Sequence, residues 1–212
     1  MTTVLLTGFE AFGDDATNPS GEAVGLVASR WDGPAVLVTA VLPVTFAGAA
    51  VAMRELVDAH APDVVIAVGL AGGRSAIGVE RVAVNLVDAR IPDNDGAQPI
   101  DERSVEGAPD ARFASLPVKA IVSAIASAGI PVELSHSAGT FVCNHVFFHA
   151  LELASTSSGT RAGFIHVPWD AEHAPADAAS LPLRDIATAL ELAVRTSLHS
   201  TVDARVIGGA LD

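Results

Sequence analysis

Short apolar runs rich in β-branched residues alternate along this chain with longer segments of helical periodicity. The apolar runs lie at 3–7, 36–42, 64–68, 79–87 and 163–167. The helical segments lie at 20–31, 45–60, 117–128, 143–153 and 180–199. Strands that alternate with helices predict an α/β fold, with a mostly parallel sheet covered by helices on both faces.

One part of the pattern departs from strict alternation. No long helical segment separates the run at 79–87 from the run at 64–68. We therefore expect at least one antiparallel neighbour, and a mixed sheet. The following segment, 88–112, is rich in turn formers and charge, which predicts a surface loop. It lacks the alternating ligands and the closing Glu of a calcium loop, so a solvated loop is favoured.

Length and charge limit the classes of protein to consider. With 212 residues, half of them apolar, the chain is long enough for a full core, and residues 1–212 are expected to form one domain. The formal net charge of −13 disfavours nucleic acid and acidic membranes as partners. A single cysteine cannot form an intrachain disulfide, and the N-terminal sequence does not resemble a secretory signal. We therefore expect a cytoplasmic protein.

The segment 34–53 imitates a membrane span, because it contains no charged residue and is long enough to cross a bilayer. Its first part is a β-branched run, which Pro43 interrupts, and Thr45 can cap the Ala-rich helix that follows. A buried strand followed by a helix is the favoured interpretation, so no membrane association is expected.

Cys143, the one cysteine, lies where a Gly-containing turn runs into an apolar helical pattern. A helix N-terminus carries partial positive charge and free backbone N–H groups, which stabilise a thiolate and can bind an oxyanion. The alternative is a small buried hydrophobic residue with no role in chemistry.

A nucleophilic cysteine needs a base, and His166 ends the run at 163–167, where functional residues of α/β sheets gather. The alternative is a histidine whose nitrogens are satisfied in the core. Glu80, an acid inside an apolar run, is a candidate to orient that imidazole. It could also be an ordinary partner of Arg81 or an exposed carboxylate on a strand face.

Two other segments could form a functional site, one a metal site and one an anion-binding turn. His145 and His149 are four residues apart, which puts both on one helix face, as a metal site requires, but the Glu of H-E-x-x-H is missing. The run GLAGGR at 69–74 resembles an anion-binding turn, yet it is neither G-x-G-x-x-G nor a Walker loop. A backbone-lined substrate pocket or a tight turn is therefore favoured there.

Taken together, the chain resembles the pyroglutamyl peptidase I family over almost its whole length. Five segments in order carry the resemblance: LTGFEAFG at 6–13 with NPS at 18–20; AGGR at 71–74 with ERVAVN at 80–85; DARIPDN at 88–94; GTFVCN at 139–144; and FIHVP at 164–168. The resemblance implies a three-layer α/β/α sandwich with a mixed, mostly parallel sheet, and a homotetramer.

The implied activity is that of a cysteine exopeptidase without cofactor or metal, which removes an N-terminal pyroglutamyl residue from peptides through an acyl-enzyme. Residue by residue, the resemblance implies that Cys143 attacks, His166 acts as base and then acid, and Glu80 orients the imidazole. The positions that match the pocket around the pyrrolidone ring are Phe9, Phe12, Phe141 and Val142. Aromatic walls suit a flat, uncharged lactam.

Arg90 is a candidate to hold the oxyanion together with the Cys143 backbone N–H. Leu70 departs from the family pattern, where many members have Gln, and Asp14 and Asp15 stand where a further aromatic often follows. The alternative functions are a nonenzymatic lactam- or peptide-binding protein that keeps the pocket, and a metal-dependent amidase that uses His145 and His149.

Overall fold

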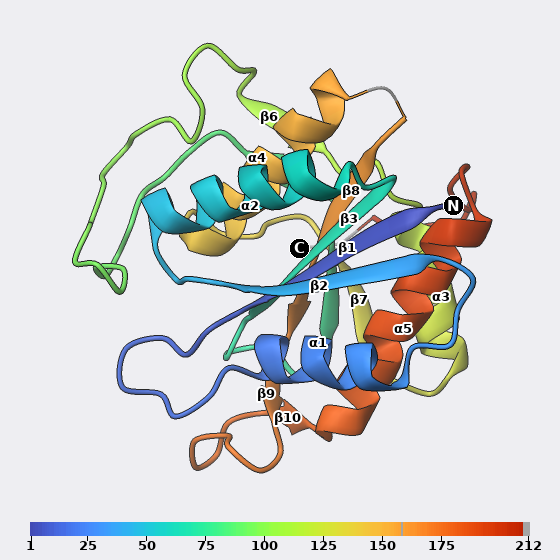
Figure 1. The fold of residues 1–212 in the computed structure, drawn as a ribbon. Coiled ribbons are helices and arrows are strands. Elements are labelled where there is room, and N and C mark those ends of the chain that lie inside the picture. The colour runs from blue at the N-terminus through green and yellow to red at the C-terminus, as the bar shows by residue number, and fades with distance from the viewer. Residues whose placement is uncertain (158, 210–212) are drawn as a thin grey trace.

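A six-stranded sheet runs through the middle of the molecule in a computed structural model that describes residues 1–157 and 159–209 (Figure 1). Its strand order is β2-β1-β3-β8-β4-β7. These strands are β1 (Thr3–Phe9), β2 (Val36–Leu42), β3 (Val64–Leu70), β4 (Ile77–Glu80), β7 (Val132–Ser135) and β8 (Arg161–Val167). All neighbours pair in parallel except β4 and β8, so the sheet is mixed and mostly parallel, as expected.

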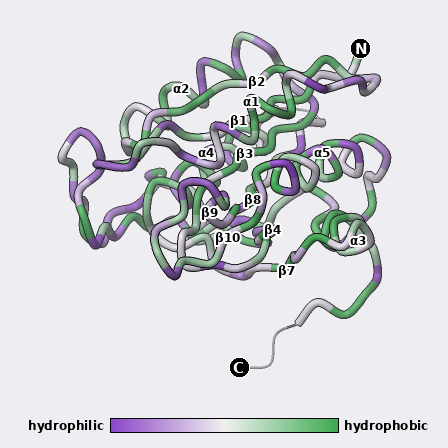
Figure 2. The backbone as a smooth tube through the Cα atoms, turned by 90° about the horizontal axis from the view of Figure 1, so that it is seen from below, coloured by the Kyte–Doolittle hydropathy of each residue, from purple (hydrophilic) through white to green (hydrophobic). Residues whose placement is uncertain are grey.

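Helices cover both faces of this sheet, which confirms the three-layer α/β/α sandwich (Figure 1). The helices are α1 (Pro19–Arg30), α2 (Phe46–His60), α3 (Val118–Ser127), α4 (Val142–Thr156) and α5 (Leu183–His199). Helices α2 and α4 pack on one face, and α1, α3 and α5 on the other. Figure 2 shows hydrophobic residues gathered along the strands and hydrophilic ones on the peripheral loops.

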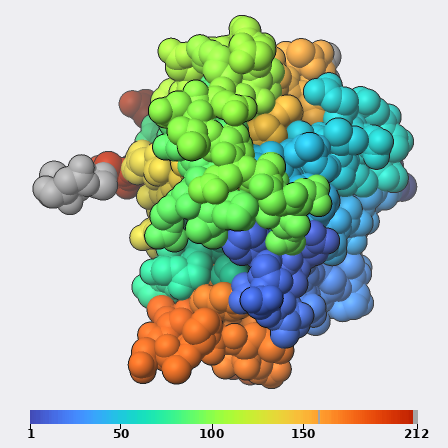
Figure 3. Space-filling view, turned by 90° about the vertical axis from the view of Figure 1, so that its left-hand side faces the viewer, coloured from blue at the N-terminus to red at the C-terminus, as the bar shows by residue number. Residues whose placement is uncertain are grey.

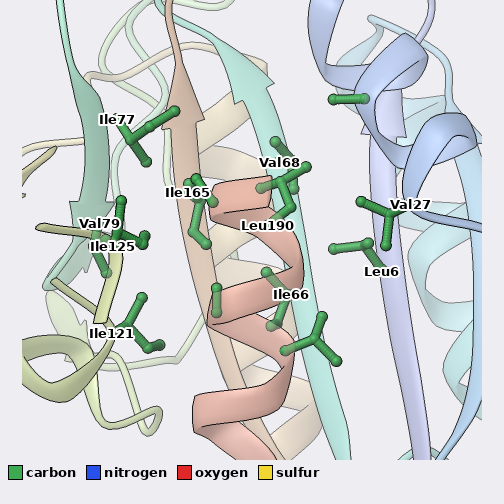
Figure 4. Packing of buried hydrophobic residues seen from close by; sticks show 14 of the residues in the cluster. Leu6, Val27, Ile66, Val68, Ile77, Val79, Ile121, Ile125, Ile165 and Leu190 are labelled. Carbon is green, nitrogen blue, oxygen red and sulfur yellow. The ribbon is translucent and has the colours of Figure 1, made fainter. Parts of the chain in front are cut away.

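The two faces of the sheet carry separate apolar cores, because successive strand residues point to opposite faces. In β1, Leu6 contributes to the core under α1 and α5, whereas Leu5 contributes to the core under α2 and α4. Figure 4 shows the first of these cores, where Ile66 and Ile165 from neighbouring strands pack against Leu190 of α5. Two-sided burial explains why β3 reads as a continuous apolar run.

The antiparallel strand takes a different neighbour from the one the chain order suggests. Residues 71–76, between β3 and β4, are too few for the crossover that a parallel return requires, so β4 runs antiparallel. Its antiparallel partner is β8, which lies between β3 and β4 in the sheet. The expected mixed sheet is therefore confirmed. The strand that lies between β3 and β4 is β8, which comes later in the chain than both.

The predicted strand at 79–87 is wrong as a single element. The chain leaves the main sheet after Glu80, and β5 (Val82–Val84) pairs instead with β6 (Ala111–Phe113) in a separate two-stranded sheet. A continuous apolar run does not show such a change of partner, because the residues of both short strands are mostly apolar. The short strands β6, β7, β9 (Trp169–Asp170) and β10 (Ser180–Leu181) were also not predicted.

Side-chain caps start two of the helices, one of them at the predicted Thr45. The Asn18 side chain accepts from the Ser20 N–H to start α1, and the Thr45 hydroxyl accepts from the Gly48 N–H to start α2. The last helix starts later than predicted, at Leu183, because residues 180–181 form β10. The segment 34–53 forms β2 and the first half of α2, and no helix of the described residues is long and apolar enough to cross a membrane.

The segment predicted as a loop at 88–112 is a long loop up to residue 110, where β6 follows, and it spreads over one side of the molecule, green in Figure 3, beside the N-terminal residues in blue. It folds back over α4, where the Ser104 hydroxyl lies 2.8 Å from Nδ1 of His145. The His145 and His149 rings stack edge to face at 4.5 Å beneath it. Burial, with a smaller contribution from His149, lowers the pKa of His145 to about 4.

The His145 pKa predicts a loss of stability on acidification. Between about pH 6.5 and pH 4 the unfolded chain binds a proton that the folded chain refuses, so the free energy of unfolding falls as the pH falls, by on the order of 3 kcal/mol for this group. In His145→Gln that contribution disappears, and urea unfolding at several pH values should give a flatter profile. The same substitution at exposed His136 is the matched control. Equal slopes for His145→Gln and the parent protein would contradict the prediction.

Candidate active site

The candidate nucleophile, Cys143, is the second residue of α4. Gly139 adopts a left-handed conformation, with φ of 76°, in the turn that leads to the helix, and Phe141 is the N-cap in an extended conformation. Within the described chain, no side chain caps α4, in contrast to α1 and α2. The backbone N–H groups of the first turn are therefore left for another partner, as expected near a candidate oxyanion site.

The Cys143 sulfur lies over Gly69, near the carboxyl end of β3. A Cβ atom placed on Gly69 would lie 2.7 Å from Sγ and 2.9 Å from Cζ of Phe164. Gly69 pairs with His166 across the β3–β8 ladder, so the sulfur lies over the strand next to the one that carries the imidazole. Only glycine leaves room for the thiol at this position, because any side chain would occupy its place.

His166 and Glu80 form a buried pair, with Nδ1 of the imidazole 2.7 Å from Oε1 of the carboxylate. Glu80 is fully buried, and His166 is 5 % exposed. The antiparallel register between β4 and β8 brings the two residues together from positions 86 apart in the chain. Because Nδ1 faces the carboxylate, Nε2 is the imidazole nitrogen left to exchange a proton with a nucleophile.

Glu80 has a second partner, which the sequence did not indicate. Nη2 of Arg74 lies 3.0 Å from the same Oε1 that contacts His166. The alternative pairing with Arg81 is wrong, because the Arg81 guanidinium lies over the Phe113 ring, 6.0 Å from its centroid. The run GLAGGR therefore contributes a side chain at its end. Arg74 precedes β4 and Glu80 ends it, so the two side chains come from one short segment of the chain.

Burial raises the pKa of the Cys143 thiol to about 12, and the negative charge of Glu80 adds to this rise. Arg74 and the cysteine's own backbone N–H act in the opposite direction, with smaller effect. The expectation that the helix start alone would stabilise a thiolate is thus outweighed by desolvation. At neutral pH the sulfur carries its proton, and any attack by Cys143 requires a base to remove it.

A small, mainly apolar hollow of about 110 Å³ opens beside the sulfur. It is lined by Phe9, Phe12, Asp15, Asn18, Val44, Leu70, Phe141, Val142 and Cys143. The Phe12 and Phe141 rings meet edge to face with centroids 5.7 Å apart, and Phe46 supports Phe141 from behind at 5.2 Å. All the pocket residues that the resemblance implied, apart from Arg90, line this hollow.

Arg90 is exposed, and it is not among the described residues that line the hollow. Its role with the oxyanion stays a prediction. Sequence reasoning missed Val44, which belongs to no recognisable motif, whereas Asp15 was noted only as a departure from the family pattern. Asn18 was noted only within the NPS segment; its side chain caps α1 and also donates to the Glu10 carbonyl.

The long loop fixes the wall of the hollow that bears Phe12. Oδ1 of Asn94 accepts from the Gly13 N–H, and its Nδ2 donates to the Ala11 carbonyl. The neighbouring Asp93 accepts from the Phe46 N–H at the start of α2. These bonds tie residues 11–13 and Phe46 to a single loop, so the two aromatic supports of the hollow share one anchor.

The rival metal interpretation finds no wider ligand set in the part of the chain that the structure describes. No group of three or more His, Cys, Asp or Glu side chains able to hold a metal ion occurs among residues 1–157 and 159–209. Nδ1 of His145 is engaged with Ser104, and its ring also meets Phe46 edge to face. The two histidines contribute to the packing of the loop on α4.

Comparison with known proteins finds one family of similar proteins along almost the whole chain. A family model described as pyroglutamyl peptidase matches residues 2–200. The pyrrolidone-carboxylate peptidases of Clavibacter michiganensis subsp. michiganensis and Cupriavidus taiwanensis are each 49% identical to this chain, over 100% of both sequences.

Solved structures agree with the sequence relatives. The crystal structure of pyroglutamyl peptidase I from Bacillus amyloliquefaciens has 43% identity and a TM-score of 0.92, covering 96% of this chain and 100% of that one. The pyrrolidone carboxyl peptidase of Thermococcus litoralis has 40% identity and a TM-score of 0.93, covering 98% and 100%. With its fold, its buried Glu–His pair and these relatives in agreement, the chain belongs to the pyroglutamyl peptidase family.

Proposed function

We propose that this protein is a cysteine exopeptidase that hydrolyses the amide bond after an N-terminal pyroglutamyl residue of peptides. The observation that carries the proposal is the buried Glu80–His166 pair at 2.7 Å, with His166 on the strand next to the one under a thiol that lines a small apolar hollow. Relatives named for this activity cover the whole chain. Catalysis follows from proton transfer and positioning, with no cofactor in the scheme.

In the first half of the proposed reaction, Nε2 of His166 takes the thiol proton as Sγ of Cys143 attacks the scissile carbonyl carbon. The new C–S bond forms, and the carbonyl π electrons move to oxygen, which the N–H groups at the start of α4 stabilise. Glu80 favours the cationic imidazole that this step creates. The C–N bond then breaks, and the imidazolium returns its proton to the leaving amine.

In the second half, a water replaces the peptide amine. His166 takes a proton from the water as the water oxygen attacks the thioester carbonyl carbon. The C–S bond then breaks as the sulfur leaves as a thiolate. The imidazolium proton returns to the thiolate. The balance is one water consumed and one amide bond cleaved into 5-oxoproline and a free peptide amine. The high thiol pKa fits this scheme, because the proton leaves only as the bond forms.

The hollow explains the proposed selectivity for a lactam. Pyroglutamate is neutral and flat at its N-terminal end, so no charge is desolvated when it packs against the Phe12 and Phe141 side chains that line the hollow. A free amino terminus would carry its charge into an apolar site at a cost of several kcal/mol. Leu70 keeps the lining apolar at the position where many relatives carry Gln. The Asp15 carboxylate is exposed, at the solvent side of the hollow.

One prediction of this proposal concerns the nucleophile. Cys143→Ala should lower turnover of a pyroglutamyl chromogenic amide by a factor on the order of 10³ or more, because no covalent intermediate can form. Far-UV circular dichroism should match that of the parent protein, since a methyl group fits where the thiol was. Iodoacetamide should inactivate the parent, and a bound substrate should slow that inactivation. Undiminished turnover by Cys143→Ala would remove this residue from the mechanism.

Another prediction of this proposal concerns substrate selectivity. The kcat/KM for a pyroglutamyl amide should exceed that for the prolyl amide, which has the same ring size but a charged nitrogen, by about 100-fold or more. Phe12→Ala opens one wall to water and should reduce this ratio. Phe113→Ala removes a ring that is 72% exposed and lies elsewhere, so it is the matched control. Equal kcat/KM for the two amides would argue against a lactam pocket.

The organisation of the protein is also a proposal. We propose one catalytic domain that assembles as a homotetramer and works in the cytoplasm, where its thiol stays reduced. One sheet shared by both cores supports the single domain. A single cooperative unfolding transition, a tetramer mass by light scattering and activity in the cytosolic fraction are the expected results. Two separate transitions would contradict the single domain, and a monomer mass at working concentration would contradict the tetramer.

A further inference from the structure

The Glu80 carboxylate has an unusual environment for a group that is fully buried. Its Oε1 is shared between Nδ1 of His166 at 2.7 Å and Nη2 of Arg74 at 3.0 Å. Its other oxygen, Oε2, is buried without a hydrogen-bond partner among the described residues. A buried carboxylate of this kind is stable as an anion only if a cation compensates it. Neutral His166 cannot supply that charge, whereas Arg74 always can.

The Arg74 guanidinium is held in place from its far side. Nη2 also donates to the Ser135 hydroxyl and the Ser137 carbonyl, each at 3.0 Å, at the end of β7. Nη1 lies 3.6 Å from Oε1 of Glu133, a carboxylate that is half exposed. Arg74 therefore bridges the edge strand to the catalytic pair, and its position is set by groups outside the reaction.

Glycines on both sides of His166 make this arrangement possible. Gly69 and Gly78 pair with His166 on its two neighbouring strands. The Cys143 sulfur lies over Gly69, and Nη1 of Arg74 lies over Gly78, where it would be 2.0 Å from an added Cβ. The imidazole thus has the thiol on one side and the guanidinium on the other, each in a space that a side chain would fill.

We propose that Arg74 is a positioning residue for the reaction, which keeps Glu80 ionised and turned toward His166 and so prepares the imidazole to take the Cys143 proton. Arg74 does not line the hollow, and its contact within the catalytic group is with Glu80, while its charge also favours the Cys143 thiolate. This inference rests on the proposed function for its consequence in catalysis. The electrostatic part of the inference does not depend on the substrate. The titratable groups around the Arg74 guanidinium are Glu80, His166, Glu133 and the Cys143 thiol.

The first experiment compares pH profiles of kcat/KM on a pyroglutamyl amide. Arg74→Met removes the cation beside the Glu80 carboxylate and the imidazole that it contacts, so the acid limb of the profile should move up by about one pH unit or more. The fall in kcat/KM should be about 100-fold at neutral pH. Arg74→Lys keeps the charge and should recover most of the acid limb. Arg184→Met, an exposed arginine on α5, is the matched control.

Gly78→Ala is a second route to the same state. The added methyl group displaces the guanidinium while Glu80, His166 and Cys143 keep their side chains, so the acid limb should move in the same direction as in Arg74→Met. This variant keeps the inference testable if Arg74→Met does not fold. A uniform loss of activity at every pH in both variants, with an unmoved acid limb, would overturn the inference and leave Arg74 a structural role.

A substrate-independent measurement separates this inference from the proposed function. The rate of Cys143 alkylation by iodoacetamide, followed by mass spectrometry across pH, reports the thiol directly. Arg74→Met should react several-fold more slowly at a fixed alkaline pH, because the cation that favours the thiolate is gone. If the parent does not cleave pyroglutamyl amides but this difference appears, the function fails and the positioning role stands. Cleavage by the parent with identical alkylation profiles in both proteins overturns the positioning role alone.

Discussion

The contact between a buried carboxylate and a buried imidazole is the constraint on which the rest of the site depends. Oε1 of Glu80 and Nδ1 of His166 lie 2.7 Å apart, and both residues have almost no exposure. Such a pair is costly to form unless a third group compensates it, which is why Arg74 reaches in from the loop between β3 and β4. The antiparallel placement of β4 beside β8 makes this geometry possible.

Two glycines beside His166 leave the space into which the thiol and the guanidinium pack. The sheet surface beside His166 carries Gly69 on one neighbouring strand and Gly78 on the other. The space left at Gly69 admits the thiol of Cys143, so a helix on top of the sheet can bring its first turn down to the strands. The thiol is consequently desolvated, which keeps it protonated until a base acts.

The hollow for the acyl group is assembled from segments that are far apart in the chain. The ends of β1 and β3 supply Phe9 and Leu70, and the start of α4 supplies Phe141. These meet because parallel strands place their carboxyl ends at one edge of the sheet. The long loop then fixes the outer wall through Asn94 and Asp93, so a segment with little regular structure determines the shape of a binding site.

Much of this protein follows from its sequence. Alternating apolar runs and helical periods predicted the layered α/β fold, and Cys143, His166 and Glu80 were candidates from local pattern and family resemblance, because hydrophobic period and local motifs act over short distances. Tertiary structure alone decided which groups meet. The split after Glu80 and the pairing with Arg74 rather than Arg81 depend on which strands become neighbours. Strand pairing joins residues 86 positions apart, and no local pattern encodes that choice.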